Sequence, residues 1–240
     1  MNMILFETYP SNGFVPMTDD RAKHVAQILK LKAGDTFKMG IINESEGLAT
    51  ITKIDEEGIS FIYEKTATPK LYPVTLICAQ VRPICMKRIL REAVSLGIER
   101  LILCGSDTGE KSYLSSNLYK TGEYKEYLLD GAMQACHAGI SEVLFTSDAN
   151  QAIEMAKKYY ETDASYVMLD NVVGAIALSQ ATIKEKAILA IGPERGWSDR
   201  ERSLFRNAGF EPMLLGSRVL RTETACSCGL AVLLSRMGLL

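Results

Sequence analysis

Apolar and polar residues alternate differently in the two parts of this chain. Residues 3–7 form a short apolar run typical of a strand, and a helical pattern follows from residue 18. We expect Thr18 to cap this helix, with Asp19 and Asp20 in its first turn. Its predicted apolar stripe has a helical spacing and consists of Ala22, Val25, Ala26, Ile28 and Leu29.

Three segments after the turn at Gly34 and Asp35 are rich in β-branched and aromatic residues. They cover residues 36–42, 48–54 and 59–63, and turn-forming stretches at 43–47 and 55–58 separate them. This pattern predicts a small barrel or curled sheet. The proline-containing stretch 65–73 has few core-type residues and predicts a domain boundary near residue 72. We therefore expect domains at residues 1–71 and 72–240.

The second domain shows the alternation of short apolar strands and helical segments that is typical of an α/β fold. The predicted strands are residues 74–79, 100–104, 142–145, 166–169, 187–191 and 212–215. Such a rhythm predicts a mostly parallel sheet flanked by helices. Ligands of parallel sheets bind at the carboxyl ends of strands, so the loops after residues 169, 191 and 215 are the candidate ligand-binding loops.

Composition narrows the function classes. Of the 240 residues 47% are hydrophobic, but no apolar run approaches the roughly 20 residues of a membrane helix, so we expect a cytoplasmic protein with no membrane partner. Six cysteines without C-x-x-C spacing and two histidines make a metal site or a disulfide framework an unfavoured prediction. The net charge of -2 means that any RNA contact must come from local basic patches.

The first candidate ligand-binding segment is Ile-Gly-Pro-Glu-Arg-Gly-Trp at residues 191–197, between a predicted strand and a predicted helix. Gly192 and Gly196 allow close approach of the backbone to a ligand, and Pro193 stiffens the turn. Ser198 and Glu201 have capping-box spacing. An ordinary strand-to-helix loop explains this segment equally well on its own.

The second segment, residues 214–225, reads Leu-Leu-Gly-Ser-Arg-Val-Leu-Arg-Thr-Glu-Thr-Ala before an apolar helix. Helix capping explains Glu223 and the two threonines. It does not explain Arg218 and Arg221, because cations at a helix N-terminus oppose the helix dipole. These arginines are therefore candidates for contact with a ligand or a phosphate.

Together these two motifs resemble the bacterial 16S ribosomal RNA uridine-N3 methyltransferases of the knotted SPOUT class, the RsmE family. The pairing of Ile-Gly-Pro-Glu-x-Gly with Leu-Gly-x-Arg-Val-Leu-Arg-Thr-Glu-Thr carries the resemblance. Weaker matches at residues 24–35, at residues 87–97 and at Gln134 extend it over nearly the whole chain.

The resemblance implies a PUA-like β-barrel domain, a second domain with a trefoil knot, and a homodimer. It implies S-adenosyl-L-methionine as cofactor and 16S ribosomal RNA or the small ribosomal subunit as partner, with no metal. The expected cofactor-binding residues lie in the three strand-end loops and are Leu169, Ile191, Gly192, Pro193, Gly196, Leu215, Gly216, Val219, Leu220 and Thr222.

The reaction that the resemblance implies is methylation of N3 of a uridine, the family site being uridine 1498 of the small subunit. Because N3 lies on the pairing edge, the base must be unpaired or flipped out. We expect Arg221 to stabilise the negative charge that develops on the ring carbonyls. Glu223 is a candidate general base, with helix capping as its alternative role. The candidate RNA-binding residues are Lys30, Lys32, Arg88 and Arg218.

Three residues depart from the family pattern near the expected pocket. Arg195 stands at a usual glycine, where arginine is strained if the position needs positive φ. Ser217 replaces a usual proline, and His137 a usual arginine, although a structural histidine is the favoured interpretation. An alternative function is therefore a non-catalytic or differently targeted RNA-binding protein. A dinucleotide-dependent oxidoreductase is disfavoured, because no G-x-G-x-x-G follows any predicted strand.

Overall fold

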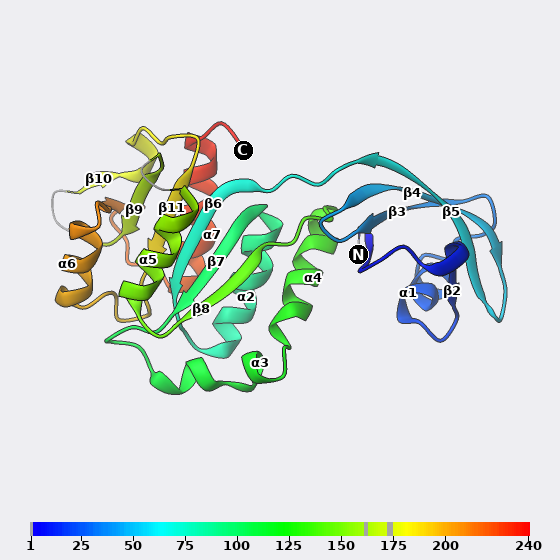
Figure 1. Cartoon of the computed structure of the whole chain (residues 1–240), viewed down its shortest axis with the longest axis horizontal. Helices are drawn as coiled ribbons and strands as arrows, with labels where there is room; N and C mark the ends of the chain where they lie inside the picture. The colour runs from blue at the N-terminus through cyan, green and yellow to red at the C-terminus, as the bar shows by residue number, and fades with distance from the viewer. Residues whose placement is uncertain (1, 161–162, 172–174) are drawn as a thin grey trace. The chain divides into compact units, whose positions relative to one another are not determined.

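The computed structural model describes residues 2–160, 163–171 and 175–240 (Figure 1). The chain forms two compact units. The first combines Met1–Lys70 with Leu129–Ile140, and the second combines Leu71–Leu128 with Ser141–Leu240. A single cut near residue 72 does not describe this division, because residues 129–140 return to the first unit. Their return depends on tertiary contacts such as the hydrogen bond from Asn43 N to Ala138 O, at 2.9 Å.

The first unit contains a curled five-stranded sheet in the order β1-β3-β4-β5-β2, counted over the described residues. Only the β1–β3 pair is parallel. Register shifts between Glu46 and Gly47 and between Ile51 and Lys53 interrupt the β4–β5 pairing, and such bulges bend a sheet. The strands are β1 (Ile4–Phe6), β2 (Phe14–Pro16), β3 (Thr36–Ile41), β4 (Ser45–Ile54) and β5 (Gly58–Ala67).

Two expectations for this unit need correction. Strand β2 was not predicted, because three residues ending in proline carry no alternating pattern. The stretch 65–73 is largely strand, since β5 continues to Ala67 and the next strand begins at Tyr72. The wide linker that its prolines suggest is therefore reduced to residues 68–71.

The first helix also differs from its prediction. Asp19, and not Thr18, caps α1 (Asp20–Lys23) by accepting a 2.8 Å hydrogen bond from Arg21 N. The helix continues as a π-helical turn, His24–Ile28, which rotates later side chains away from the expected stripe. Ala22 and Val25 are buried, whereas Ile28 remains 68% exposed.

The second unit contains a seven-stranded sheet in the order β10-β12-β9-β11-β6-β7-β8, in which every described pair is parallel. The two-residue strand β10 was not predicted. The strands are β6 (Tyr72–Ala79), β7 (Ile98–Cys104), β8 (Glu142–Thr146), β9 (Ser165–Leu169), β10 (Ile176–Ala177), β11 (Ala187–Ile191) and β12 (Glu211–Leu214). This sheet agrees with the mostly parallel α/β fold that the sequence predicts.

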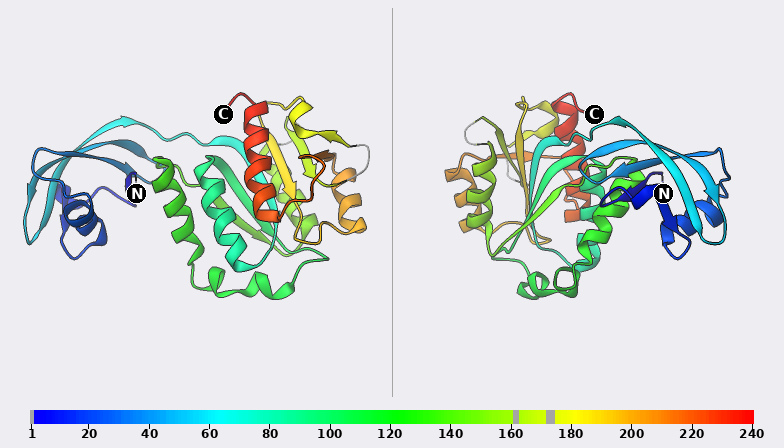
Figure 2. Two further views of the ribbon diagram at one scale, coloured as in Figure 1. Left: turned by 180° about the vertical axis from the view of Figure 1, so that it is seen from behind. Right: turned by 45° about the vertical axis from the view of Figure 1, so that its right-hand side comes forward.

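Helices cover both faces of this sheet, as the front view in Figure 1 and the rear view in Figure 2 show. On one face α2 (Pro83–Ser95) packs beside α7 (Thr222–Arg236), and on the other α5 (Ala149–Tyr160) packs beside α6 (Asp199–Asn207). The remaining helices are α3 (Asn117–Lys120), α4 (Tyr124–Ala135) and the 3₁₀ turns Ser11–Gly13, Lys111–Ser115 and Leu178–Gln180.

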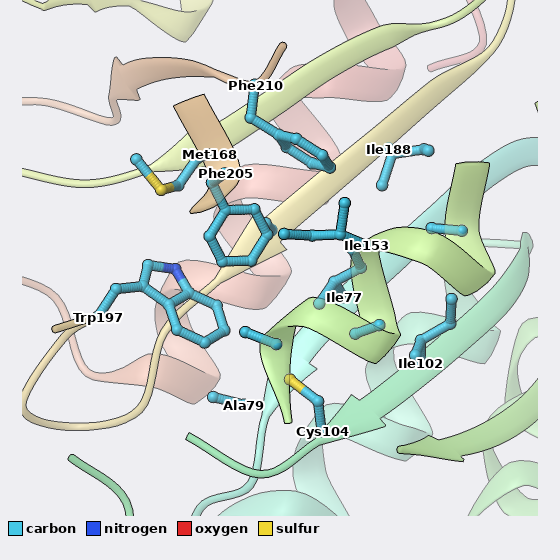
Figure 3. Close-up of a cluster of buried hydrophobic side chains, with 14 of the residues drawn as sticks. Ile77, Ala79, Ile102, Cys104, Ile153, Met168, Ile188, Trp197, Phe205 and Phe210 are labelled. Atoms are coloured by element: carbon cyan, nitrogen blue, oxygen red, sulfur yellow. The ribbon is translucent and has the colours of Figure 1, made fainter. Parts of the chain in front are cut away.

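Successive side chains of β6 point alternately to the two faces of the sheet. Ile77 and Ala79 pack in the core beneath α5 and α6, whereas Cys78 points the other way, with its Sγ 3.9 Å from that of Cys226 on α7. Figure 3 shows the α5 and α6 side, where the ring of Phe205 contacts Trp197 in a tilted geometry and Phe210 edge to face. Their successive ring centroids lie 4.8 and 5.0 Å apart. This packing anchors the loop that follows β11, because Trp197 ends it.

Candidate functional site

A cavity of about 120 Å³ lies at the carboxyl ends of β9 and β11 and beside the loop that follows β12. Arg218, predicted to bind RNA, also lines it. Gly216 is the one predicted cofactor residue that does not. The predicted cofactor residues that line it are Leu169, Ile191, Gly192, Pro193, Gly196, Leu215, Val219, Leu220 and Thr222.

Strand register brings these loops together. Leu169 of β9 is paired with Ile191 of β11 on one side and with Met213 of β12 on the other. The next residue, Asp170, donates its backbone N–H to Met213 O at 3.2 Å. Because the three strands are parallel and level at this edge, segments far apart in sequence form one cavity.

The loop after β11 is held by a dense set of hydrogen bonds. Gly196 N donates to Pro193 O at 2.8 Å, and Thr108 Oγ1 donates to Gly196 O at 2.6 Å. Ser198 and Glu201 form the predicted capping box at the start of α6. Positive φ, 72°, occurs at Gly196 and not at the exposed Arg195. The strain considered for Arg195 is therefore absent.

Helix α7 forms part of the cavity wall by close approach to the sheet. A Cβ on Gly229 would lie 2.6 Å from Leu169 Cδ1, so a larger residue there would displace the end of the Leu169 side chain. Thr222 Oγ1 donates to Gly192 O at 3.3 Å, which ties the helix start to the β11 loop. The N-cap residue Arg221 makes no side-chain cap bond. Glu223 is buried, and among the described residues no backbone N–H donates a hydrogen bond to its carboxylate, so the capping role considered for it is not observed.

Sequence reasoning missed several lining residues, namely Asp170, Asn171, Glu194, Trp197, Met213 and Ala225. Asp170 forms an ion pair with Arg202 of α6, whose Nε and Nη2 lie 2.5 and 3.2 Å from its two carboxylate oxygens. This bond is the main cause that raises the pKa of Arg202. The position of Asp170, directly after a strand, was an available signal, but nothing in the sequence pairs it with Arg202.

Comparison with known proteins identifies the family. The model of an RNA methyltransferase domain matches residues 68–234, and that of an RNA methyltransferase PUA domain matches residues 17–62. A ribosomal RNA small subunit methyltransferase E from Treponema pallidum is 35% identical over 98% of this chain and 91% of its own length. This chain belongs to the ribosomal RNA small subunit methyltransferase E family. A second member, from Borreliella burgdorferi, is 29% identical over 94% of each chain.

Solved structures related to this family share its fold. The methyltransferase E of Neisseria gonorrhoeae, solved with S-adenosyl methionine bound, superposes with a TM-score of 0.79 at 20% identity, covering 98% of this chain and 97% of that one. A probable rRNA methyltransferase from Porphyromonas gingivalis gives 0.79 and covers 99% of both chains. The predicted SPOUT-type α/β fold and PUA-like N-terminal domain are thereby confirmed.

The two residues predicted to act in catalysis differ in exposure. Arg221 is exposed and follows Leu220 at the cavity rim. Glu223 is only 8% exposed. Burial of the Cys85 thiol on α2, together with the nearby negative charge of Glu223, raises the pKa of Cys85. The structure thus places Arg221 beside the cavity and Glu223 within the contact between α7 and α2.

The predicted RNA-binding residues lie in separate places. Lys30 and Lys32 are exposed in the first unit, where Lys30 has a φ of 54° at the end of the helical segment. Arg88 is exposed on α2, and Arg218 is exposed at the cavity. Each side chain is accessible for a phosphate contact.

His137 has structural partners. Its Nδ1 accepts a 3.0 Å hydrogen bond from Gly139 N, and its Nε2 lies 3.6 Å from Glu46 Oε1. This geometry supports the structural interpretation of His137. Over residues 2–160, 163–171 and 175–240 no cluster of metal-ligating side chains is found. In the same described ranges no helix is long and apolar enough to span a bilayer.

Proposed function

We propose that this protein transfers the methyl group of S-adenosylmethionine to N3 of a uridine in 16S ribosomal RNA, at the family site uridine 1498. Family membership supports ribosomal RNA methylation. The observation that carries the proposal is the convergence of the β9, β11 and β12 loops on one cavity, because the motifs of the resemblance form its walls.

The lining of this cavity fits S-adenosylmethionine. Leu169, Ile191 and Leu215 provide apolar walls for a flat adenine ring, and Gly192 and Gly196 leave the backbone open to polar ligand groups. The side chain of Val219 is 81% exposed at the rim, as expected of a wall that a ligand covers. When bound, S-adenosylmethionine supplies an electrophilic methyl group on its sulfonium.

The protein's own contribution is alignment and charge stabilisation. N3 of the uridine forms a bond to the methyl carbon, the carbon–sulfur bond breaks, and the N3 proton leaves to a base. The guanidinium of Arg221 stabilises the charge on the uridine carbonyls as that proton departs. Glu223 stays in the proposal as the candidate proton acceptor, and it lies buried near Cys85 of α2.

The proposal includes the domain organisation, oligomeric state, cellular location and RNA contacts of the enzyme. The expected domains, 1–71 and 72–240, stay in the proposal with the change that residues 129–140 belong to the first unit. A trefoil knot in the second domain and a cytoplasmic homodimer acting on the small subunit follow from the resemblance. Lys30, Lys32, Arg88 and Arg218 are the proposed RNA contacts, and their exposure supports this role.

Calorimetric titration with S-adenosylmethionine is the first test, followed by transfer of labelled methyl groups to 16S ribosomal RNA and to small subunits. We expect saturable binding near one per chain and 3-methyluridine in the digested RNA. Binding without transfer would contradict the enzymatic proposal and favour a non-catalytic RNA-binding protein. A different methylated nucleoside would contradict the N3 assignment alone.

A further inference from the structure

A second cavity in the same unit is not used by the proposed reaction. It has a volume of about 390 Å³ and lies where β6, β7 and β8 end. That volume falls within the range of about 300–1,000 Å³ typical of small-molecule sites. Its lining includes Gln80, Ser106, Leu114 and Asp148, with Gly109 and Glu110 at one side.

Gln80 brings an unsatisfied hydrogen-bond donor to this cavity. The residue is 3% exposed, and its backbone N–H is held by Cys104 O at 2.8 Å. Tyr119 donates its hydroxyl to Gln80 Oε1 at 2.6 Å, which fixes the side-chain amide. Within the described part of the chain Gln80 Nε2 and Ser106 Oγ have no partner. Buried polar atoms are normally satisfied, so these two groups in the wall of a cavity are available to hydrogen-bond a ligand.

A hollow lined by two arginines and two glutamates, Glu110 and Glu194, shares residues with this cavity and with the candidate cofactor cavity. Arg82 and Arg195 line it, and both are exposed. It shares Glu194 with the cofactor cavity, and it shares Gly109 and Glu110 with the cavity of Gln80. Among the described residues neither arginine forms an ion pair. Three neighbouring hollows therefore follow one edge of the sheet.

The charges along this edge suit different parts of a nucleotide. The charged residues that line the cavity are Asp107, Glu110, Lys111 and Asp148, and the carboxylates among them can accept hydrogen bonds from the N–H groups of a base. The free amide of Gln80 complements an acceptor on a base edge, since every nucleobase has one. Arg82 and Arg195 match a phosphate.

We propose that the cavity of Gln80 and Ser106 binds the base of an unpaired nucleotide that neighbours the methylated one, with Arg82 and Arg195 contacting the phosphate between them. This inference rests on the proposed RNA substrate and assigns a role to Arg195, the departure from the family glycine. The neighbouring base would then determine which RNA segment presents its uridine.

The test compares variants in equilibrium binding to a fluorescent fragment of the substrate RNA. Gln80→Glu keeps the acceptor for Tyr119 and removes the free amide donor, and Ser106→Ala removes the free hydroxyl. We expect each to weaken RNA binding by about tenfold. In the Arg82→Gln/Arg195→Gln variant, the slope of log K against log salt should fall by about 0.7 per arginine. Arg206→Gln, at an exposed arginine on α6, is the matched control.

Abasic substitution in the RNA makes the test specific for a base. Removing the base beside the target uridine should weaken RNA binding by the unaltered protein. The Ser106→Ala variant has already lost the contact with this base, so the abasic RNA should bind it almost as tightly as the intact RNA does. The inference is overturned if Gln80→Glu and Ser106→Ala bind RNA as the Arg206→Gln control does. Calorimetry with S-adenosylmethionine separates the two proposals. If the unaltered protein does not bind S-adenosylmethionine, the proposed function is contradicted. If every variant binds it normally, a loss of RNA binding is assigned to the RNA site alone.

Discussion

The two loops that face each other across the candidate cofactor cavity are built differently. After β11, Gly192, Pro193 and Trp197 are buried, and side chains from two distant segments hydrogen-bond the loop carbonyls. After β12, every residue from 216 to 221 is exposed. One wall is therefore formed by the core before any ligand arrives, whereas the other presents side chains to solvent.

This difference predicts that the β11 loop contributes to stability and the β12 loop to ligand binding and catalysis. Changes in the β11 loop act on folding, because its shape depends on core packing. Changes in the β12 loop act on binding and chemistry, since exposed side chains contribute little to stability. Four predictions test the comparison, from the largest expected effect to the smallest.

Arg221→Ala gives the largest expected effect. Loss of a charge-stabilising group lowers the single-turnover rate of methyl transfer by about 10²–10³-fold. Affinity for S-adenosylmethionine and the melting temperature stay near the values of the unaltered protein, because Arg221 is exposed. Arg221→Lys retains the charge and recovers part of the rate. An unchanged single-turnover rate in Arg221→Ala would remove this residue from the mechanism.

Glu201→Gln tests the cavity wall formed by the loop after β11. Glu201 is fully buried, and its two carboxylate oxygens accept hydrogen bonds from Asp107 N at 2.9 Å and from Ser198 N at 2.8 Å. An amide can accept only one of these, so the free energy of unfolding falls by about 1–3 kcal/mol. Chemical denaturation measures this loss, with Glu211→Gln at an exposed position as control. Equal stability of both variants would contradict the view that this wall depends on core hydrogen bonds.

Val219→Ala tests the exposed wall. The side chain is 81% exposed, so stability changes by less than about 0.5 kcal/mol. If the cofactor covers it, the two lost carbons raise the Kd for S-adenosylmethionine roughly tenfold, at about 0.8 kcal/mol each. Ile62→Ala, 66% exposed in the first unit, leaves that Kd unchanged. Unaltered affinity in Val219→Ala would show that this rim does not contact the cofactor.

Alkylation of Cys85 gives the smallest expected effect. Burial and the negative charge of Glu223 raise the pKa of this thiol, which moves its reaction with iodoacetamide to higher pH. Glu223→Gln removes the charge, lowers the pKa of Cys85 and speeds alkylation, by about tenfold if the pKa falls by one unit. The exposed Cys228 serves as internal standard. A slower reaction in Glu223→Gln would contradict the contact between these two side chains.

The strand-end loops were accessible to sequence reasoning, because their signals are local. Short apolar runs mark β9 and β11, and glycine spacing marks the loop after β11, so the cavity lining was largely predicted. Errors arose where local signals are weak. The π-helical turn after Lys23 exposes Ile28 despite its helical spacing, and β2 is too short for a pattern.

The sequence by itself determined the parallel α/β organisation, the capping box at Ser198 and the resemblance carried by its two glycine-containing motifs, since each depends on residues close along the chain. Only the tertiary structure decided that Arg202 pairs with Asp170, that Glu223 faces Cys85 and that Gln80 has an unpartnered amide in a second cavity. These relations join side chains far apart in sequence. Their geometry is set by strand register and helix packing, which no single segment encodes.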